Sequence, residues 1–120
     1  MKAEELRIGN IIKFSESDEI FLAYEIMPSG FRVRNKNEDT WIEEWQFEGI
    51  EITQDWLVKF GFLKMNSTWW TCYKNTNFRM SISFDLELSG NWTGIRIKYV
   101  HQLQNLFYAL TGEELSLSGI

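Results

Sequence analysis

The chain has few residues that could carry covalent or metal chemistry. Its 120 residues include one histidine, one cysteine and one proline. A lone cysteine cannot form an internal disulfide, and a structural zinc site requires four cysteine or histidine ligands. The glycine-rich phosphate-binding patterns GxxxxGK and GxGxxG are both missing from the sequence. The sequence therefore predicts no metal, no cofactor and no catalytic residue.

Long apolar runs are missing as well. No segment approaches the roughly 18 apolar residues that a membrane-spanning helix needs. The first ten residues, MKAEELRIGN, lack the apolar centre of a secretory signal peptide. On these grounds we expect a cytoplasmic protein that does not associate with a membrane.

Aromatic side chains, by contrast, are plentiful. The chain contains nine phenylalanines, six tryptophans and four tyrosines, which is typical of a folded domain rather than a disordered segment. Charge is unevenly spread, because residues 1–55 carry a net charge of -7 and residues 56–120 a net charge of +2. An acidic chain repels phosphate backbones, so general nucleic-acid binding is disfavoured. A local nucleic-acid site in the second half stays open.

The first half reads as short strands separated by polar turns. The apolar or alternating segments are LRIGNIIKF (6–14), EIFLAYEI (19–26), FRVRN (31–35) and FEGIEI (47–52). Gly9 and Asn10 interrupt the first of these, where a turn that needs a positive φ is easily formed. Strands at this spacing predict a small antiparallel, barrel-like sheet of the SH3 kind over residues 1–52.

The second half, residues 53–120, predicts a helix, a three-stranded meander and a second helix. Thr53 is expected to cap a short helix over residues 53–60, with Gly61 as its left-handed stop. The strands are expected at 69–74, 78–88 and 92–99. Alternation within 78–88 places one set of side chains on the apolar face, namely Phe78, Met80, Ile82, Phe84, Leu86 and Leu88.

The last helix is expected over residues 100–111, where apolar side chains recur at helical spacing and Gly112 follows as a stop. It should pack on the apolar face of the meander, which gives an α+β fold. The two parts, 1–52 and 53–120, are expected to share one structural unit. His101 falls at the polar edge of this helix, so we interpret it as a packing residue.

Two groups of residues with catalytic potential have simpler structural interpretations. Cys72 and His101 could form a nucleophile–base pair, but Cys72 on a strand is usually a small apolar residue. Asp85 and Glu87 share a strand face, as the carboxylates of glycosidases do at suitable spacing. Arg79 is expected on the same face, so a charge-balanced, solvated surface is the simpler interpretation. We therefore expect a protein that is not an enzyme.

Basic and aromatic residues gather in the second half and form the candidate interaction surface. Its members are Trp69, Trp70, Lys74, Arg79, Trp92, Arg96 and Lys98. Exposed tryptophan favours protein partners, and cations beside aromatic rings are also typical of single-strand nucleic-acid binding. The leading hypothesis is a protein-binding module, and the alternative is a nucleic-acid-binding accessory factor that uses the same surface.

Three sequence blocks follow one another in a recognisable order. They are LRIGN (6–10), ITQDWLVKFGF (52–62) and IKYVHQLQNLFYALTGEEL (97–115). Through these blocks the chain resembles an uncharacterised family of short proteins from bacterial genomes and their prophages. The resemblance implies an accessory protein of a mobile element, and it carries over no activity, ligand or site residue.

Overall fold

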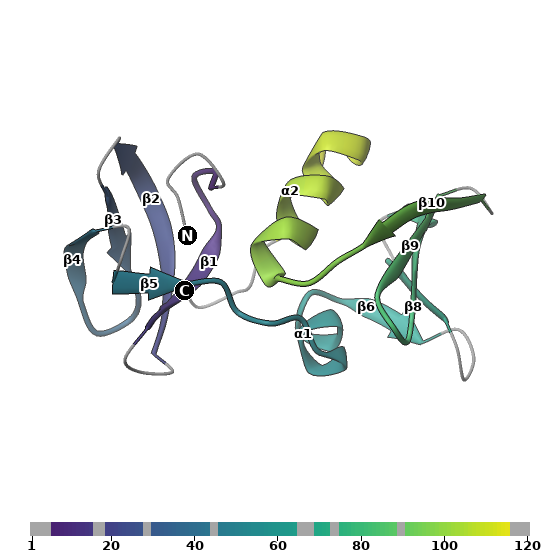
Figure 1. The fold of residues 1–120 in the computed structure, drawn as a ribbon, viewed down its shortest axis with the longest axis horizontal. Coiled ribbons are helices and arrows are strands. Elements are labelled where there is room, and N and C mark those ends of the chain that lie inside the picture. Colours follow the sequence, from purple (N-terminus) through teal and green to yellow (C-terminus); the bar gives the residue numbers. More distant parts are fainter. Residues whose placement is uncertain are drawn as a thin grey trace.

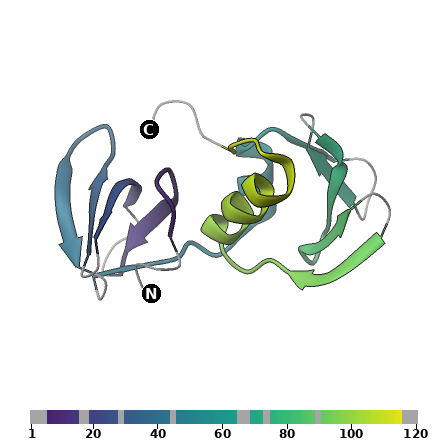
Figure 2. The ribbon, with the colours of Figure 1, turned by 90° about the horizontal axis from the view of Figure 1, so that it is seen from above.

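The chain forms two five-stranded antiparallel sheets with two helices between them in a computed structural model (Figure 1). The structure describes residues 6–15, 19–27, 30–43, 46–64, 69–72, 75–88 and 91–115, with backbone alone at 69–72 and 75–77. The helices are α1 (Gln54–Lys59) and α2 (Val100–Thr111). Figure 2, turned by 90°, again shows α2 between the sheets. The α+β class predicted from the sequence is confirmed.

The first sheet has the strand order β4-β3-β2-β1-β5. Its strands are β1 (Ile11–Phe14), β2 (Ile20–Met27), β3 (Gly30–Arg34), β4 (Asp39–Glu43) and β5 (Phe47–Glu48). The sheet curls, and its curvature brings the rings of Phe31 on β3 and Phe47 on β5 to 4.3 Å from each other. It does not close into the expected barrel, since β4 and β5 end the sheet without pairing with each other.

Alternating side chains fill the inside of this curl. On β3, Phe31 and Val33 are fully buried, whereas Arg32 and Arg34 are exposed, as the sequence pattern predicts. The buried cluster consists of Leu6, Ile12, Phe21, Ala23, Phe31, Val33, Ile42 and Phe47. Burial of this apolar area provides the main stabilisation of the first sheet.

The second sheet has the order β10-β9-β8-β7-β6. Its strands are β6 (Phe62–Lys64), β7 (Trp69–Cys72), β8 (Asn75–Ser81), β9 (Asp85–Leu88) and β10 (Asn91–Arg96). A three-stranded meander is therefore present as β8, β9 and β10. β7 lies within the strand expected at 69–74. The sheet is larger than predicted, because β6 pairs with β7 at its edge and because the segment expected as one strand at 78–88 contributes to both β8 and β9.

The expectation of one continuous strand over residues 78–88 is wrong. β8 ends at Ser81, and the chain reverses so that Met80 pairs with Leu86 in β9. The backbone N–H of Phe84 donates to the carbonyl of Ser81 at 2.9 Å, and Phe84 has a φ of 64°. Ile82 lies in this turn and is 43% exposed, so its predicted place on the apolar face is also wrong.

Both predicted helices form, and both end at a glycine. Gly61, with a φ of 88°, follows α1, and Gly112, with a φ of 75°, follows α2, as the sequence predicts. A left-handed residue at this position lets the backbone satisfy the last carbonyls of a helix. Thr53 occupies the N-cap position of α1 in an extended conformation, but its side chain makes no capping hydrogen bond.

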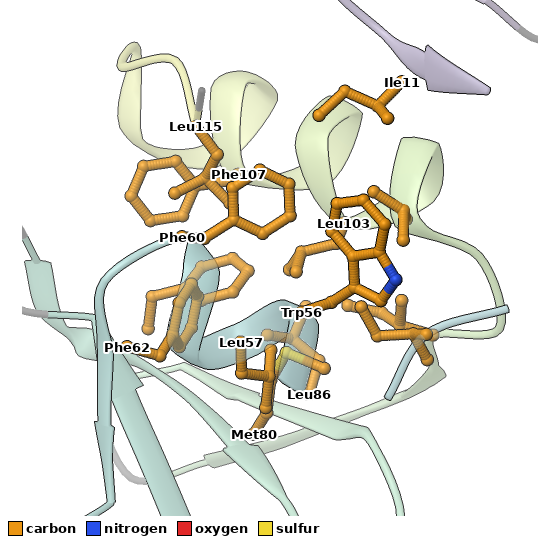
Figure 3. Close-up of a cluster of buried hydrophobic side chains, with 14 of the residues drawn as sticks. Ile11, Trp56, Leu57, Phe60, Phe62, Met80, Leu86, Leu103, Phe107 and Leu115 are labelled. Carbon is orange, nitrogen blue, oxygen red and sulfur yellow. The ribbon is translucent and has the colours of Figure 1, made fainter. Parts of the chain in front are cut away.

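The core of the second half lies between the second sheet and the two helices (Figure 3). Phe107 of α2 is at its centre, with its ring 5.0 Å from Phe78 and 6.5 Å from Phe62. Three members of this cluster come from before α1, namely Ile11, Ile50 and Ile52. The second core is thus completed by residues that also belong to the first sheet and the segment following it.

Candidate functional site

The two halves are joined by a buried amide on α2. Gln104 is 1% exposed, and its Oε1 accepts a hydrogen bond from the backbone N–H of Ile11 at 2.9 Å. Its Nε2 donates to the carbonyls of Gly9 at 3.0 Å and Leu115 at 3.2 Å. β5 pairs with β1 only at Lys13 and Phe14. At Ile11, the Gln104 amide therefore makes the hydrogen bond that a neighbouring strand would otherwise make. A side chain that satisfies buried backbone groups in this way is expensive to remove.

A ring of polar contacts surrounds this amide. Asn10 is buried and donates through Nδ2 to Oδ1 of Asn105 at 2.9 Å. Arg7 forms a two-pronged ion pair with Glu114, with Nη2 at 2.9 Å and 3.1 Å from the two carboxylate oxygens. The Arg7 guanidinium also lies 4.3 Å from the ring centre of Tyr108.

These contacts bring together the sequence blocks on which the resemblance rests. LRIGN supplies the turn that Gln104 binds, and the last block supplies Gln104 itself. ITQDWLVKFGF adds Ile52 and Trp56 to the same core. The first and last segments therefore meet at the joint between the halves, and the middle segment contributes to the core of the second half. The sequence patterns did not single out Gln104, because its contact with Ile11 joins residues 93 apart along the chain.

His101 is a buried residue of α2. Its ring is 1% exposed and stacks on Tyr99, with centroids 5.5 Å apart and planes 14° apart. The possible partner Cys72 has a side chain outside the described residues. Asp85 and Glu87 each form an ion pair with a cation on a neighbouring strand.

These ion pairs lie across adjacent strands on the outer face of the second sheet. Arg79 of β8 is opposite Glu87 of β9, with Nη1 and Oε1 3.8 Å apart. Arg96 of β10 is opposite Asp85 of β9, with Nε and Oδ1 3.0 Å apart. The hydrogen bond and the negative charge of Asp85 raise the pKa of Arg96 above its ordinary value. Two of the predicted surface cations are thus partly neutralised.

Among the described side chains of this sheet, Trp92 is the most exposed large apolar one. It is opposite Glu87 on edge strand β10 and is 71% exposed. A bulge follows it, where Gly94 has a φ of 79° and the hydroxyl of Thr93 donates to the carbonyl of Leu86 at 2.9 Å. The bulge leaves Ile95 38% exposed. A bulge on an edge strand hinders pairing with other chains.

The remaining predicted surface residues are not assembled with Trp92 by any described contact. The side chains of Trp69 and Trp70 and the whole of Lys74 lie outside the described residues. Lys98 is exposed, and its Nζ is 5.2 Å from the ring centre of Tyr99. Arg79 and Trp92 therefore lie on either side of Glu87. Arg96 lies at the end of β10, opposite Asp85, and Lys98 follows that strand.

A groove of about 530 Å³ opens where the chain passes from the first sheet to α1. It is lined by Lys13, Glu48, Gly49, Ile50, Glu51, Thr53, Trp56 and Tyr99. Lys13 and Glu48, which are opposite each other on β1 and β5, form an ion pair at 3.3 Å, and Lys59 lies 4.6 Å from the ring centre of Trp56. The groove has charges of both signs, which selects no single class of ligand.

Metal-binding and membrane-spanning features are not found in the described part of the chain. No group of three or more His, Cys, Asp or Glu side chains there could hold a metal ion. None of the helices formed by the described residues is long and apolar enough to cross a membrane. In comparisons with known proteins, no family model, curated protein or solved structure matches this chain.

Proposed function

We propose that this chain is a non-enzymatic interaction module that binds another protein, as an accessory protein of a bacterial or prophage genome. The observation that carries this proposal is Trp92, 71% exposed at the edge of the second sheet. Indole rings dominate many protein interfaces, because covering their large apolar area releases free energy.

The charges beside Trp92 favour a protein partner over a nucleic acid. Arg79 and Arg96 already lie next to carboxylates, with which a phosphate backbone would have to compete. Affinity for nucleic acid rests mainly on cations that neutralise phosphates. A mixed set of charges around an aromatic residue is instead typical of the rim of a protein interface.

The test is photo-crosslinking in cells that naturally express the full-length protein. A benzophenone amino acid replaces Trp92 in one variant and Val58 in the control, because Val58 is also exposed, at 58%, but lies on α1. We expect a cross-linked protein species from position 92 that is missing from position 58 and resists nuclease. The absence of such a species, or its removal by nuclease, would refute the proposal.

A further inference from the structure

A second surface lies on the outer face of the first sheet, at the opposite end of the molecule from β10 (Figure 1). Arg32 and Arg34 point away from the core on β3, and their partners on β4 are Trp41 and Asp39. Residues directly opposite each other on neighbouring strands share a face of the sheet. With Tyr24 these four residues form what we define as the arginine face: Tyr24, Arg32, Arg34, Asp39 and Trp41.

A β-bulge in β2 places Tyr24 on this face. Ala23 pairs with Val33 and is fully buried, while Glu25 pairs with Arg32, so Tyr24 is the extra residue between them. Its hydroxyl donates a hydrogen bond to Oδ1 of Asp39 and accepts one from Nε of Arg32 at 3.3 Å. Bulges commonly re-aim a side chain next to a functional surface.

The side chains of the arginine face are held in place before any partner binds. The hydrogen bond with Tyr24, assisted by the charges of Asp39 and Glu25, raises the pKa of Arg32 above its ordinary value. The indole of Trp41 lies over Gly30, where an added Cβ would be 2.7 Å from the ring. Trp41 is nevertheless 39% exposed. Preorganised Tyr, Trp and Arg side chains are the commonest energetic centres of protein interfaces.

Arg34 has unused hydrogen-bonding capacity. Its guanidinium lies 5.5 Å from the ring centre of Tyr24, and it forms no ion pair with a described residue. Five N–H donors in a planar fork match the two oxygens of a carboxylate. The two nearby carboxylates are engaged elsewhere, because Glu25 lies 3.9 Å from Nε of Arg32 and Asp39 accepts the hydrogen bond of Tyr24.

We propose that the arginine face binds a segment of a partner protein that carries an aspartate or glutamate beside an apolar residue. The carboxylate pairs with Arg34, and the apolar side chain packs on Trp41. This surface is separate from Trp92, so the chain would bridge two proteins. It also stands independently, because none of its residues belongs to the surface of the proposed function.

The test uses phage display of random 12-residue peptides against the full-length protein. We expect enriched peptides to combine an acidic and an apolar residue, and a synthetic copy to bind with an affinity measurable by fluorescence anisotropy. Arg34→Ala should weaken this binding about tenfold or more, as expected for loss of a charge-assisted hydrogen-bonded pair. Lys36→Ala, a nearby exposed cation, and Trp92→Ala should leave the affinity unchanged. Thermal unfolding of each variant checks that the fold is retained.

A charge swap makes the assignment specific. Arg34→Glu should abolish binding of the selected peptide, and replacing the acidic residue of the peptide with arginine should restore it. Enrichment of peptides without acidic residues, or equal affinities for the wild type and Arg34→Ala, would overturn the proposal. So would binding of an oligothymidine at physiological salt that Arg34→Ala removes, because that result would identify a nucleic-acid surface.

Discussion

The two sheets have the same number of strands and the same antiparallel pairing, but their cores are completed differently. The first sheet curls around a cluster whose described members all lie between Leu6 and Phe47. The second sheet is covered by α1 and α2 and also takes in Ile11, Ile50 and Ile52 from before α1. Among the described residues, the second core thus depends on the first half, whereas the first core needs nothing from beyond Phe47.

The difference shows that α2 contacts both sheets, the second through apolar side chains and the first through a polar one. Phe107 fills the centre of the second core, and Gln104, on a neighbouring part of the helix surface, completes the hydrogen bonds of the first sheet. Apolar contacts hold the helix to one sheet without strong directionality. The Gln104 amide fixes its position against the other, because hydrogen bonds are directional.

The largest expected effect comes from the second core. Phe107→Ala should lower the free energy of unfolding by about 3–5 kcal/mol, as buried Phe→Ala changes do when a cavity remains. Urea unfolding followed by circular dichroism measures the loss. If the first sheet is the more self-contained unit, amide hydrogens in β8 and β9 should then exchange faster than those in β2 and β3. Equal acceleration in both sheets would contradict this asymmetry.

The next effect concerns the joint. Gln104→Leu keeps a similar volume but leaves the N–H of Ile11 and the carbonyls of Gly9 and Leu115 without their partner. Unsatisfied buried backbone groups should cost about 2–4 kcal/mol in all. The loss should also broaden the urea transition or split it in two, as the halves unfold separately.

The control for the joint is the same substitution two residues earlier in the helix. Gln102 is exposed, and its Oε1 accepts hydrogen bonds from the backbone N–H groups of Lys98 and Tyr99 at the start of α2. Gln102→Leu should cost about 1 kcal/mol, as loss of a capping contact does, and leave one transition. Equal losses for the two variants would show that Gln104 contributes only as a helix residue.

Sequence patterns predicted α2 from Val100 to Thr111 because all of their information is local. The apolar spacing and the following Gly112 lie within the helix or next to it. The joint was not predictable in the same way. Gln104 binds Gly9 and Ile11, which are more than 90 residues away, and a polar side chain near an apolar stripe is usually solvated.

The third prediction concerns the close contact between β3 and β4 in the first sheet. A Cβ at Gly30 would lie 2.4 Å from the carbonyl oxygen of Ile42, which is backbone and cannot easily move. Gly30→Ala should therefore cost about 1–3 kcal/mol through overpacking. It should also displace the Trp41 ring, which weakens binding at the proposed arginine face.

Gly112→Ala is the matched control for Gly30→Ala. Gly112 has a φ of 75°, and nothing lies within 4 Å of an added Cβ. The expected cost is about 1 kcal/mol from the left-handed backbone alone. Thermal unfolding of both variants, with tryptophan fluorescence of Gly30→Ala, separates steric from conformational strain. A larger loss for Gly112→Ala would show that the β3–β4 contact is looser than the structure indicates.

The misread strand in the second sheet has a simple geometric cause. In the hairpin, Phe78 pairs with Leu88 and Met80 with Leu86, so both members of each inward pair have even numbers. The turn contains an odd number of residues, so inward and outward positions continue to alternate through it. Period-two alternation in the sequence therefore cannot distinguish this turn from a continuous strand. The local signal was Ser81, whose hydroxyl accepts hydrogen bonds from the N–H groups of Ser83 and Asp85.

The smallest expected effect distinguishes the hairpin from a continuous strand. Ile82→Asp should change the free energy of unfolding by no more than about 0.5 kcal/mol, because the residue is 43% exposed in the turn. Met80→Asp is the matched positive control. It places the same carboxylate at a fully buried position among apolar side chains, and should unfold the second sheet. A continuous strand would bury both side chains on one face and make the two losses equal. Thermal unfolding of the two variants side by side therefore decides between the two backbones, since only the hairpin separates an exposed residue 82 from a buried residue 80.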